Sequence, residues 1–177
     1  MRIISGSHRG RAINLPAYLP VRPTTDYAKE ALFNILENHF NLSNLRVLDL
    51  FAGTGNISFE FASRGCNEIV AVEINKRCAA AINKNAEAMG FKTIKVFKDD
   101  AFRFLRKNSQ PFDLIFADPP YDHQAVAKLP EEILKADVLK EGAWFILEHA
   151  SFHSFIDHVG FSQERRYGEV HFSFFAF

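Results

Sequence analysis

Short apolar runs and longer amphipathic segments alternate through most of this chain. From residue 46 onward, the apolar runs are separated by stretches in which apolar residues recur at helical spacing. Apolar runs predict buried strands, and helical spacing predicts amphipathic helices. We expect strands at 46–50, 68–72, 94–98, 114–117 and 143–147. We expect helices at 56–63, 76–89, 102–107 and 125–136, the last interrupted by Pro130.

The N-terminal segment predicts a hairpin arm, a linker and a helix. Apolar residues at 3–4 and 12–15 flank a turn-rich segment at 6–10. Three prolines then form a stiff linker. Thr24 or Thr25 can cap the helix that follows, because a threonine hydroxyl accepts a bond from an unpaired backbone N–H of the first turn.

The pattern as a whole predicts an α/β fold. Repeated strand–helix units form a parallel sheet that helices cover on both faces. Residues 161–167 and 170–177 predict a closing antiparallel hairpin. We therefore expect a basic hairpin arm with its linker at 1–23 and one domain at 24–177. Ligands bind such sheets outside the carboxyl ends of the strands, where the strand order reverses, so we look for chemistry directly after each strand.

Composition and charge narrow the class of protein. The chain has 177 residues, which suits one domain. Two cysteines, no secretion signal and no membrane-length apolar run predict a cytoplasmic protein in a reducing compartment. The net charge is zero, but residues 1–25 hold four arginines and no acid, whereas 26–177 hold 17 basic and 21 acidic residues. The basic arm can contact a polyanion, or it can be a solvated, mobile terminus.

The first two strands are followed by a glycine-rich loop and an acid. Gly53 and Gly55 allow a tight turn and a close approach of backbone to ligand. The loop could hold a dinucleotide or another nucleoside cofactor, or be a structural turn. A dinucleotide fingerprint would carry a third glycine where this chain has Ser58. Glu73 stands 20 residues after Gly53, the spacing at which an acid reaches ribose hydroxyls.

Two more acids follow the third and fourth strands. Asp100 could accept a hydrogen bond from an adenine amino group, or cap the next helix, or do both. Asp118 begins the sequence Asp-Pro-Pro-Tyr, in which neither proline has an N–H to donate. A site lined by acceptors suits the two hydrogens of an exocyclic –NH2 group. Tyr121 adds a flat ring on which a base can stack.

These residues resemble those of a known enzyme family. Residues 49–55, Glu73 and 118–121 resemble an S-adenosylmethionine-dependent methyltransferase that acts on planar amino groups. Residues 9–11 and 21–34 are similar to the bacterial 16S ribosomal RNA guanine-966 N2-methyltransferase family, and the resemblance extends over essentially the whole chain. It implies a Rossmann-like sheet of seven strands with the last strand antiparallel.

The resemblance also implies roles for individual residues. The expected catalytic segment is Asp118, Pro119, Pro120 and Tyr121. The expected cofactor contacts are Asp49, Phe51, Gly53, Gly55, Glu73 and Asp100, with Thr24 and Thr25 closing over the methionine end. The expected RNA contacts are Arg2, Arg9, Arg11 and Arg22.

The implied reaction is methylation of the exocyclic N2 of a guanine in 16S rRNA, with S-adenosylmethionine as cofactor. The implied protein is a monomer that acts on RNA in a small-subunit particle and needs no membrane or metal. The alternatives keep the chemistry but change the substrate to adenine N6 in DNA or RNA, another rRNA position or a protein glutamine. Two further alternatives are a nicotinamide-linked oxidoreductase and a catalytically silent RNA-binding module. The target base must be unpaired or flipped out to reach such a site.

Three features have no assigned role. Glu148 ends the fifth strand and should face the same edge as Asp118. His149 and His153 have a spacing that could ligate a metal on a helix, but no third ligand accompanies them. The basic cluster at 92–107 can be a solvated face or an auxiliary RNA contact.

Overall fold

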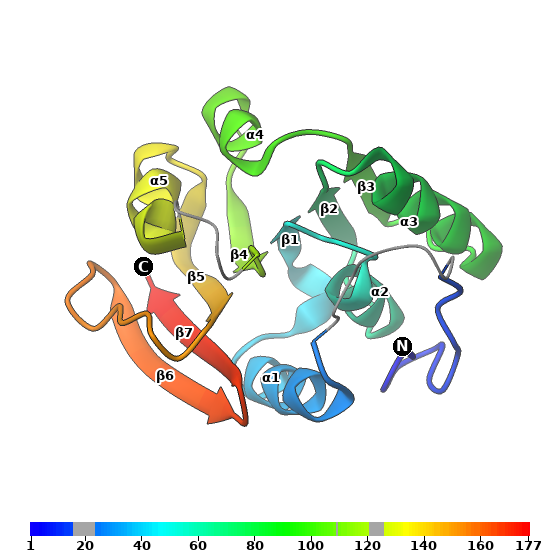
Figure 1. The fold of residues 1–177 in the computed structure, drawn as a ribbon. Helices are drawn as coiled ribbons and strands as arrows, with labels where there is room; N and C mark the ends of the chain where they lie inside the picture. Colours follow the sequence, from blue (N-terminus) through cyan, green and yellow to red (C-terminus); the bar gives the residue numbers. More distant parts are fainter. Residues whose placement is uncertain (16–23, 109, 121–125) are drawn as a thin grey trace.

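The computed structural model describes residues 1–15, 24–108, 110–120 and 126–177. Their centre is one seven-stranded sheet with the strand order β3-β2-β1-β4-β5-β7-β6 (Figure 1). The strands are β1 (Arg46–Leu50), β2 (Glu68–Val72), β3 (Ile94–Phe97), β4 (Phe112–Ala117), β5 (Leu139–His149), β6 (Phe161–Tyr167) and β7 (Val170–Ala176). Strands β1 to β5 pair in parallel, whereas β7 is antiparallel to both β5 and β6. The predicted α/β fold and its antiparallel last strand are confirmed.

Helices cover both faces of this sheet because its strands are apolar on both sides. The α-helices are α1 (Asp26–His39), α2 (Asn56–Ser63), α3 (Lys76–Met89), α4 (Ala101–Lys107) and α5 (Leu129–Lys135). Val47 of β1 packs in one core with residues of α1, α2 and α3, whereas its neighbour Leu48 packs in a second core with residues of α4 and α5 (Figure 1). This alternation explains why the strands are continuous apolar runs.

Local signals define most helix ends. The Thr25 hydroxyl accepts a hydrogen bond from the Ala28 N–H at the start of α1, and Gly90 ends α3 in the left-handed conformation. The helix expected at 125–136 is divided into a 3₁₀ turn (Val126–Lys128) and α5, with Pro130 in the first turn of α5. Proline is tolerated there because that N–H has no partner within the helix.

Strand β5 is longer than its apolar run predicts. It begins at Leu139 and ends at His149, whereas the pattern indicated 143–147. It lies between β4 and β7, so both of its edges find backbone partners. These pairings extend the strand into polar positions that the periodicity does not mark.

The predicted N-terminal hairpin is present and is packed onto α2. The Ile3 N–H donates to the Arg11 carbonyl over 3.0 Å, and Ile3 and Ile13 are buried in the same core as α1. Gly6 lies so close to α2 that an added Cβ would stand 1.9 Å from the Ser63 carbonyl oxygen. In residues 1–15 the arm is therefore an ordered part of the fold and not a solvated, mobile terminus.

Candidate functional site

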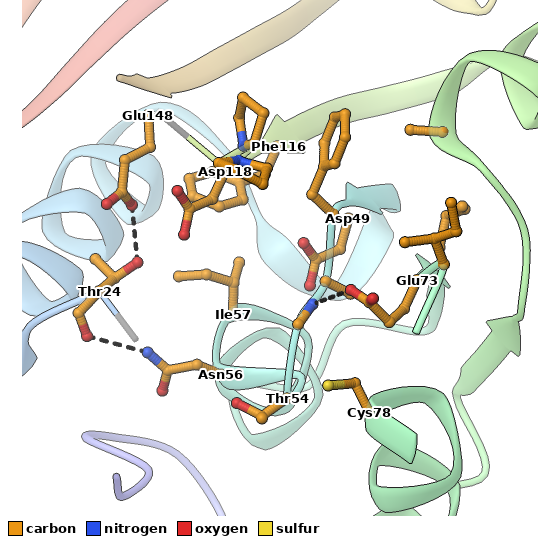
Figure 2. Close-up of a pocket in the computed structure, with 18 of the residues that line it drawn as sticks. Thr24, Asp49, Thr54, Asn56, Ile57, Glu73, Cys78, Phe116, Asp118 and Glu148 are labelled. Carbon is orange, nitrogen blue, oxygen red and sulfur yellow. Dashed lines mark hydrogen bonds between the residues drawn. The ribbon is translucent and has the colours of Figure 1, made fainter. Parts of the chain in front are cut away.

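A cavity of about 710 Å³ opens at the carboxyl ends of the central strands (Figure 2). Its walls come from the ends of β1, β2, β4 and β5, the start of α1 and the turn between β6 and β7. The strand order reverses between β1 and β4, so the cavity lies at the switch point of the sheet. Its size suits a nucleoside-sized ligand.

Glu73 is held in place by the backbone of the glycine-rich loop. One of its carboxylate oxygens accepts a hydrogen bond from the Gly53 N–H over 2.7 Å (Figure 2). The other accepts from the Asn75 N–H over 2.7 Å. Each carboxylate oxygen keeps further acceptor capacity for a ligand hydroxyl. Burial raises the pKa of Glu73.

The two loop glycines have different surroundings. Gly53, with φ of 55°, lines the cavity. Gly55, with φ of 83°, does not line it and instead precedes α2. A Cβ at Gly55 would lie 2.9 Å from the Phe59 ring and 3.1 Å from the Ile82 side chain, so packing requires glycine there. The structure does not bring this expected cofactor contact to the cavity.

Asp49 reaches the cavity from the end of β1. Its side chain is buried and accepts a hydrogen bond from the Ser58 hydroxyl. Burial, with a smaller contribution from the charge of Glu73, raises the pKa of Asp49 to about 7. Ser58 is the residue that departs from the dinucleotide fingerprint, and the structure shows that it positions this carboxylate. The sequence marked the departure but not this partner.

Asp100 takes one of the two roles that the sequence left open, and its position at the cavity is compatible with the other. It accepts a hydrogen bond from the Arg103 N–H as the cap of α4, and it lines the cavity. Its neighbour Asp99 also lines the cavity and pairs with the Arg103 side chain. Phe51, whose φ is 60°, lines the same cavity and meets Phe102 edge-to-face at 6.3 Å.

Asp118 lies at the end of β4, where Pro119 and Pro120 also line the cavity. Burial and the nearby charges of Glu148 and Asp49 raise the pKa of Asp118 well above its usual range. The two prolines offer carbonyl oxygens and no N–H groups, as the sequence indicated. Tyr121 is outside the described residues.

Hydrogen bonds of Thr24 join two elements of the cavity wall to the start of α1: the end of β5, through Glu148, and the start of α2, through Asn56. The Thr24 hydroxyl donates to the Glu148 carboxylate over 2.8 Å, and the Thr24 carbonyl accepts from the Asn56 side chain over 3.2 Å (Figure 2). Thr24 and Thr25 both line the cavity, as expected. The expected position of Glu148 at this edge is confirmed, and its threonine partner is new.

The described arginines of the arm lie outside the cavity wall. Arg2, Arg9 and Arg11 are all exposed. The Arg2 side chain pairs with Asp26 over 2.9 Å, and Arg11 donates to the Ala88 carbonyl over 3.2 Å. Arg22 is outside the described residues.

The charge of the cavity wall restricts which ligands it suits. Among the described residues, seven acids and no lysine or arginine line it: Asp49, Glu73, Asp99, Asp100, Asp118, Glu148 and Glu169. Burial is the main cause of the raised pKa values of Asp49 and Asp118, and repulsion from neighbouring acids adds to both shifts. A cationic ligand relieves this repulsion, whereas a ligand with two phosphates increases it.

His149 and His153 are not part of a metal centre in the described part of the chain. No group of three or more His, Cys, Asp or Glu residues within the described ranges is placed to hold a metal ion. His149 instead hydrogen-bonds through one ring nitrogen to the Ser173 hydroxyl and through the other to the Ala150 carbonyl. Separately, no described helix is long and apolar enough to cross a membrane.

Known proteins share this sequence and fold. YlbH of Bacillus subtilis, described as a putative rRNA methyltransferase, is 35% identical over 153 residues, which cover 84% of this chain and 82% of that protein. The ribosomal RNA small subunit methyltransferase D of Buchnera aphidicola is 31% identical over 156 residues, covering 87% and 80%.

Solved structures agree with this relationship. The hypothetical protein TTHA0928 of Thermus thermophilus superposes with a TM-score of 0.86 at 28% identity, covering 99% of this chain and 98% of that one. The T. thermophilus 16S rRNA N2 G1207 methyltransferase, solved with AdoMet and guanosine, has a TM-score of 0.70 at 22% identity over 86% of this chain and 43% of that one, and it shares the fold. The family model described as conserved hypothetical protein 95 matches residues 1–176. The chain therefore belongs to the conserved hypothetical protein 95 family, the family of the ribosomal RNA small subunit methyltransferases D.

Proposed function

We propose that this protein is an S-adenosylmethionine-dependent methyltransferase of small-subunit ribosomal RNA, and that its target is the exocyclic N2 of a guanine. Family membership supports rRNA methylation. The acidic wall of the cavity is the observation that carries the choice of cofactor. A sulfonium compound with an ammonium group suits seven carboxylates, whereas the pyrophosphate of a nicotinamide dinucleotide does not.

The residues present fit this cofactor along its length. The positioned oxygens of Glu73 would accept hydrogen bonds from the ribose hydroxyls, and Asp100 would accept one from the adenine amino group. Asp49 neighbours the centre of the cavity, and Thr24 and Thr25 lie at the wall that closes over the methionine end. Bound S-adenosylmethionine supplies a methyl group that its sulfonium charge activates.

The Asp118 segment prepares the amino group that receives this methyl. The lone pair of an exocyclic –NH2 is delocalised into the base, so the nitrogen is a weak nucleophile. The Asp118 carboxylate and the Pro119 carbonyl accept hydrogen bonds from its two N–H groups. These bonds make the nitrogen more pyramidal and richer in electrons. Once alkylated, the nitrogen is strongly acidic, and Asp118 or water takes its proton. Alignment and electrostatics then supply most of the catalysis.

The RNA must present its target outside a base-paired stack. A base within a helix cannot enter a cavity at the edge of a sheet, so the guanine is unpaired or flipped out. Exposed arginines of the arm bind the neighbouring phosphates, which adds affinity with little sequence information. A second substrate with the same chemistry, adenine N6 or a protein glutamine, would use the same acceptors.

Two measurements test the proposal. Small-subunit particles from cells that lack the enzyme are incubated with labelled S-adenosylmethionine, and the labelled nucleotide is mapped. The expected result is label on N2 of one guanine; label on adenine N6 or in the protein fraction would overturn the substrate assignment. Calorimetry should show that S-adenosylmethionine binds and that NAD does not, and the reverse result would overturn the cofactor assignment.

A further inference from the structure

Two tyrosines from distant parts of the chain form an aromatic pair beside the cavity. Tyr27, in the first turn of α1, meets Tyr167 at the end of β6 with ring centroids 5.8 Å apart and planes at 79°. Figure 1 shows the end of β6 and the start of β7 next to α1. Tyr27 is 70% exposed.

The pair lies on the rim of the cavity. Thr24 and Thr25, directly before this turn of α1, line the cavity. Val170, which pairs with Tyr167 across the β6–β7 turn, lines it as well. Each ring is therefore close in the chain to a residue of the cavity wall.

Tyr167 is held by the core, and it in turn orients Tyr27. The Tyr167 ring contacts Phe172 at 5.9 Å and packs against the core that includes α1. Its edge-to-face contact with Tyr27 restricts the more exposed ring without covering it. An exposed aromatic ring with a fixed orientation is suited to stack against another flat group.

Two arginines close to the pair already have acidic partners. Arg2 pairs with Asp26, next to Tyr27, and Arg166 pairs with Glu164, near Tyr167. The rings themselves offer a flat surface that suits stacking against another flat group. An unpaired RNA base is the flat group that an rRNA substrate provides.

We propose that Tyr27, oriented by Tyr167, is a stacking platform for an unpaired nucleotide adjacent to the target base. The proposal rests on the proposed function, because it assumes an RNA substrate whose target enters the cavity. Removing a base from a stack leaves its neighbour exposed, and an aromatic side chain at the entrance replaces the lost contact. Stacking tolerates any base, so the platform adds affinity without a sequence requirement.

The test compares variants on small-subunit particles from cells that lack the enzyme. We expect Tyr27→Ala to raise the KM for the particle about tenfold, as the loss of one stacked base implies. The Kd of S-adenosylmethionine, measured by calorimetry, and the melting temperature should stay within error, because Tyr27 is mostly exposed. Tyr27→Leu should behave like Tyr27→Ala, and Tyr27→Phe should rescue the KM, because stacking needs the ring and not the hydroxyl.

Phe152→Ala is the matched control, since Phe152 is also aromatic and 72% exposed but contacts His153 and is not part of the Tyr27–Tyr167 pair. It should leave the KM unchanged; an equal rise would overturn the platform. Irradiation of particles carrying 5-iodouridine should cross-link the rRNA to Tyr27 in the wild-type protein. If the wild-type protein methylates the particles and Tyr27→Ala has the same KM for them, the stacking role of Tyr27 is wrong and the proposed function is unaffected. If wild type does not methylate them, the proposed function fails.

Discussion

The ammonium group of Lys29 lies 3.3 Å from the carboxylate of Glu60, and both side chains are fully buried. The ammonium also donates to the Arg2 carbonyl over 2.7 Å and to the Asn56 side chain over 2.8 Å. Glu60 accepts hydrogen bonds from the Ile4 N–H at 2.8 Å and from the next N–H of the arm at 3.0 Å. One buried ion pair thus joins the arm, α1 and α2, and through Asn56 it reaches the wall of the cavity.

Removing the buried cation should destabilise the protein strongly. Lys29→Met leaves the buried Glu60 carboxylate with Arg64, at 2.9 Å, as its remaining cationic partner. We expect a loss of about 3 kcal/mol in the free energy of unfolding, the lower end for breaking a buried pair. Lys95→Met is the control, because Lys95 pairs with Glu68 at the surface, with the lysine side chain 61% exposed, and such pairs contribute less than about 1 kcal/mol. Urea titrations measure both. If both variants lose the same free energy of unfolding, the buried pair contributes no more to stability than the surface pair does.

Asp118 should be required for the chemical step. We expect Asp118→Ala to lower the single-turnover rate about 100-fold, the scale of losing one preorganised polar group. Asp157→Ala, an exposed change away from the cavity, should retain the wild-type rate. A rate for Asp118→Ala within about threefold of wild type would remove this residue from the mechanism.

Cofactor affinity should depend on pH through Asp49. Its pKa is about 7 in the free protein, and a bound cation favours the ionised carboxylate. Lowering the pH through 7 therefore protonates Asp49 and weakens binding, by up to about tenfold per pH unit for one proton. Calorimetry across this range measures how the affinity for S-adenosylmethionine changes with pH. Asp49→Asn should remove the part of this pH dependence that comes from Asp49. An identical slope in the variant would contradict the assignment.

Glu148 should tune the ionisation of Asp118. Its charge is one cause of the raised pKa of Asp118, so Glu148→Gln should lower that pKa. The acidic limb of the single-turnover rate against pH should then move to lower pH, because Asp118 stays ionised further into acid. Glu148→Asp keeps the charge and should move the limb less. If the acidic limb of the Glu148→Gln profile stays at the wild-type pH, the charge of Glu148 does not influence the ionisation of Asp118.

The arm should contribute an electrostatic part of RNA binding. Arg9→Ala combined with Arg11→Ala should raise the KM for small-subunit particles and flatten its dependence on salt, because fewer counterions are released. The control pair, Arg106→Ala with Lys107→Ala, removes the same charge from the basic cluster at 92–107. If only the control changes the salt dependence, the cluster and not the arm binds RNA.

Much of this protein could be predicted from short windows of its sequence. The bounds of β1, α2, β2 and α3 agree with the periodicity residue for residue, because both faces of the sheet are buried and each helix has a marked end. Asp49, Glu73, Asp100 and Asp118 each follow a strand or end one, and the switch-point rule was enough to expect them at one edge. The resemblance added the expected cofactor and substrate, which spacing alone left open.

Other features depend on contacts between residues that are far apart in the sequence. The sequence marked Gly55 as a ligand contact, and only the structure shows that neighbours from α2 and α3 also require glycine there for packing. Nothing local indicates that Thr24 meets Glu148, 124 residues away, or that Tyr27 meets Tyr167. The sequence by itself determined the elements and the order of polar residues along them, because hydrogen bonding and burial within an element are local. Only the tertiary structure decided which distant residues are in contact and which carboxylates have shifted pKa values. Both depend on long-range packing, which brings these residues together and removes them from water.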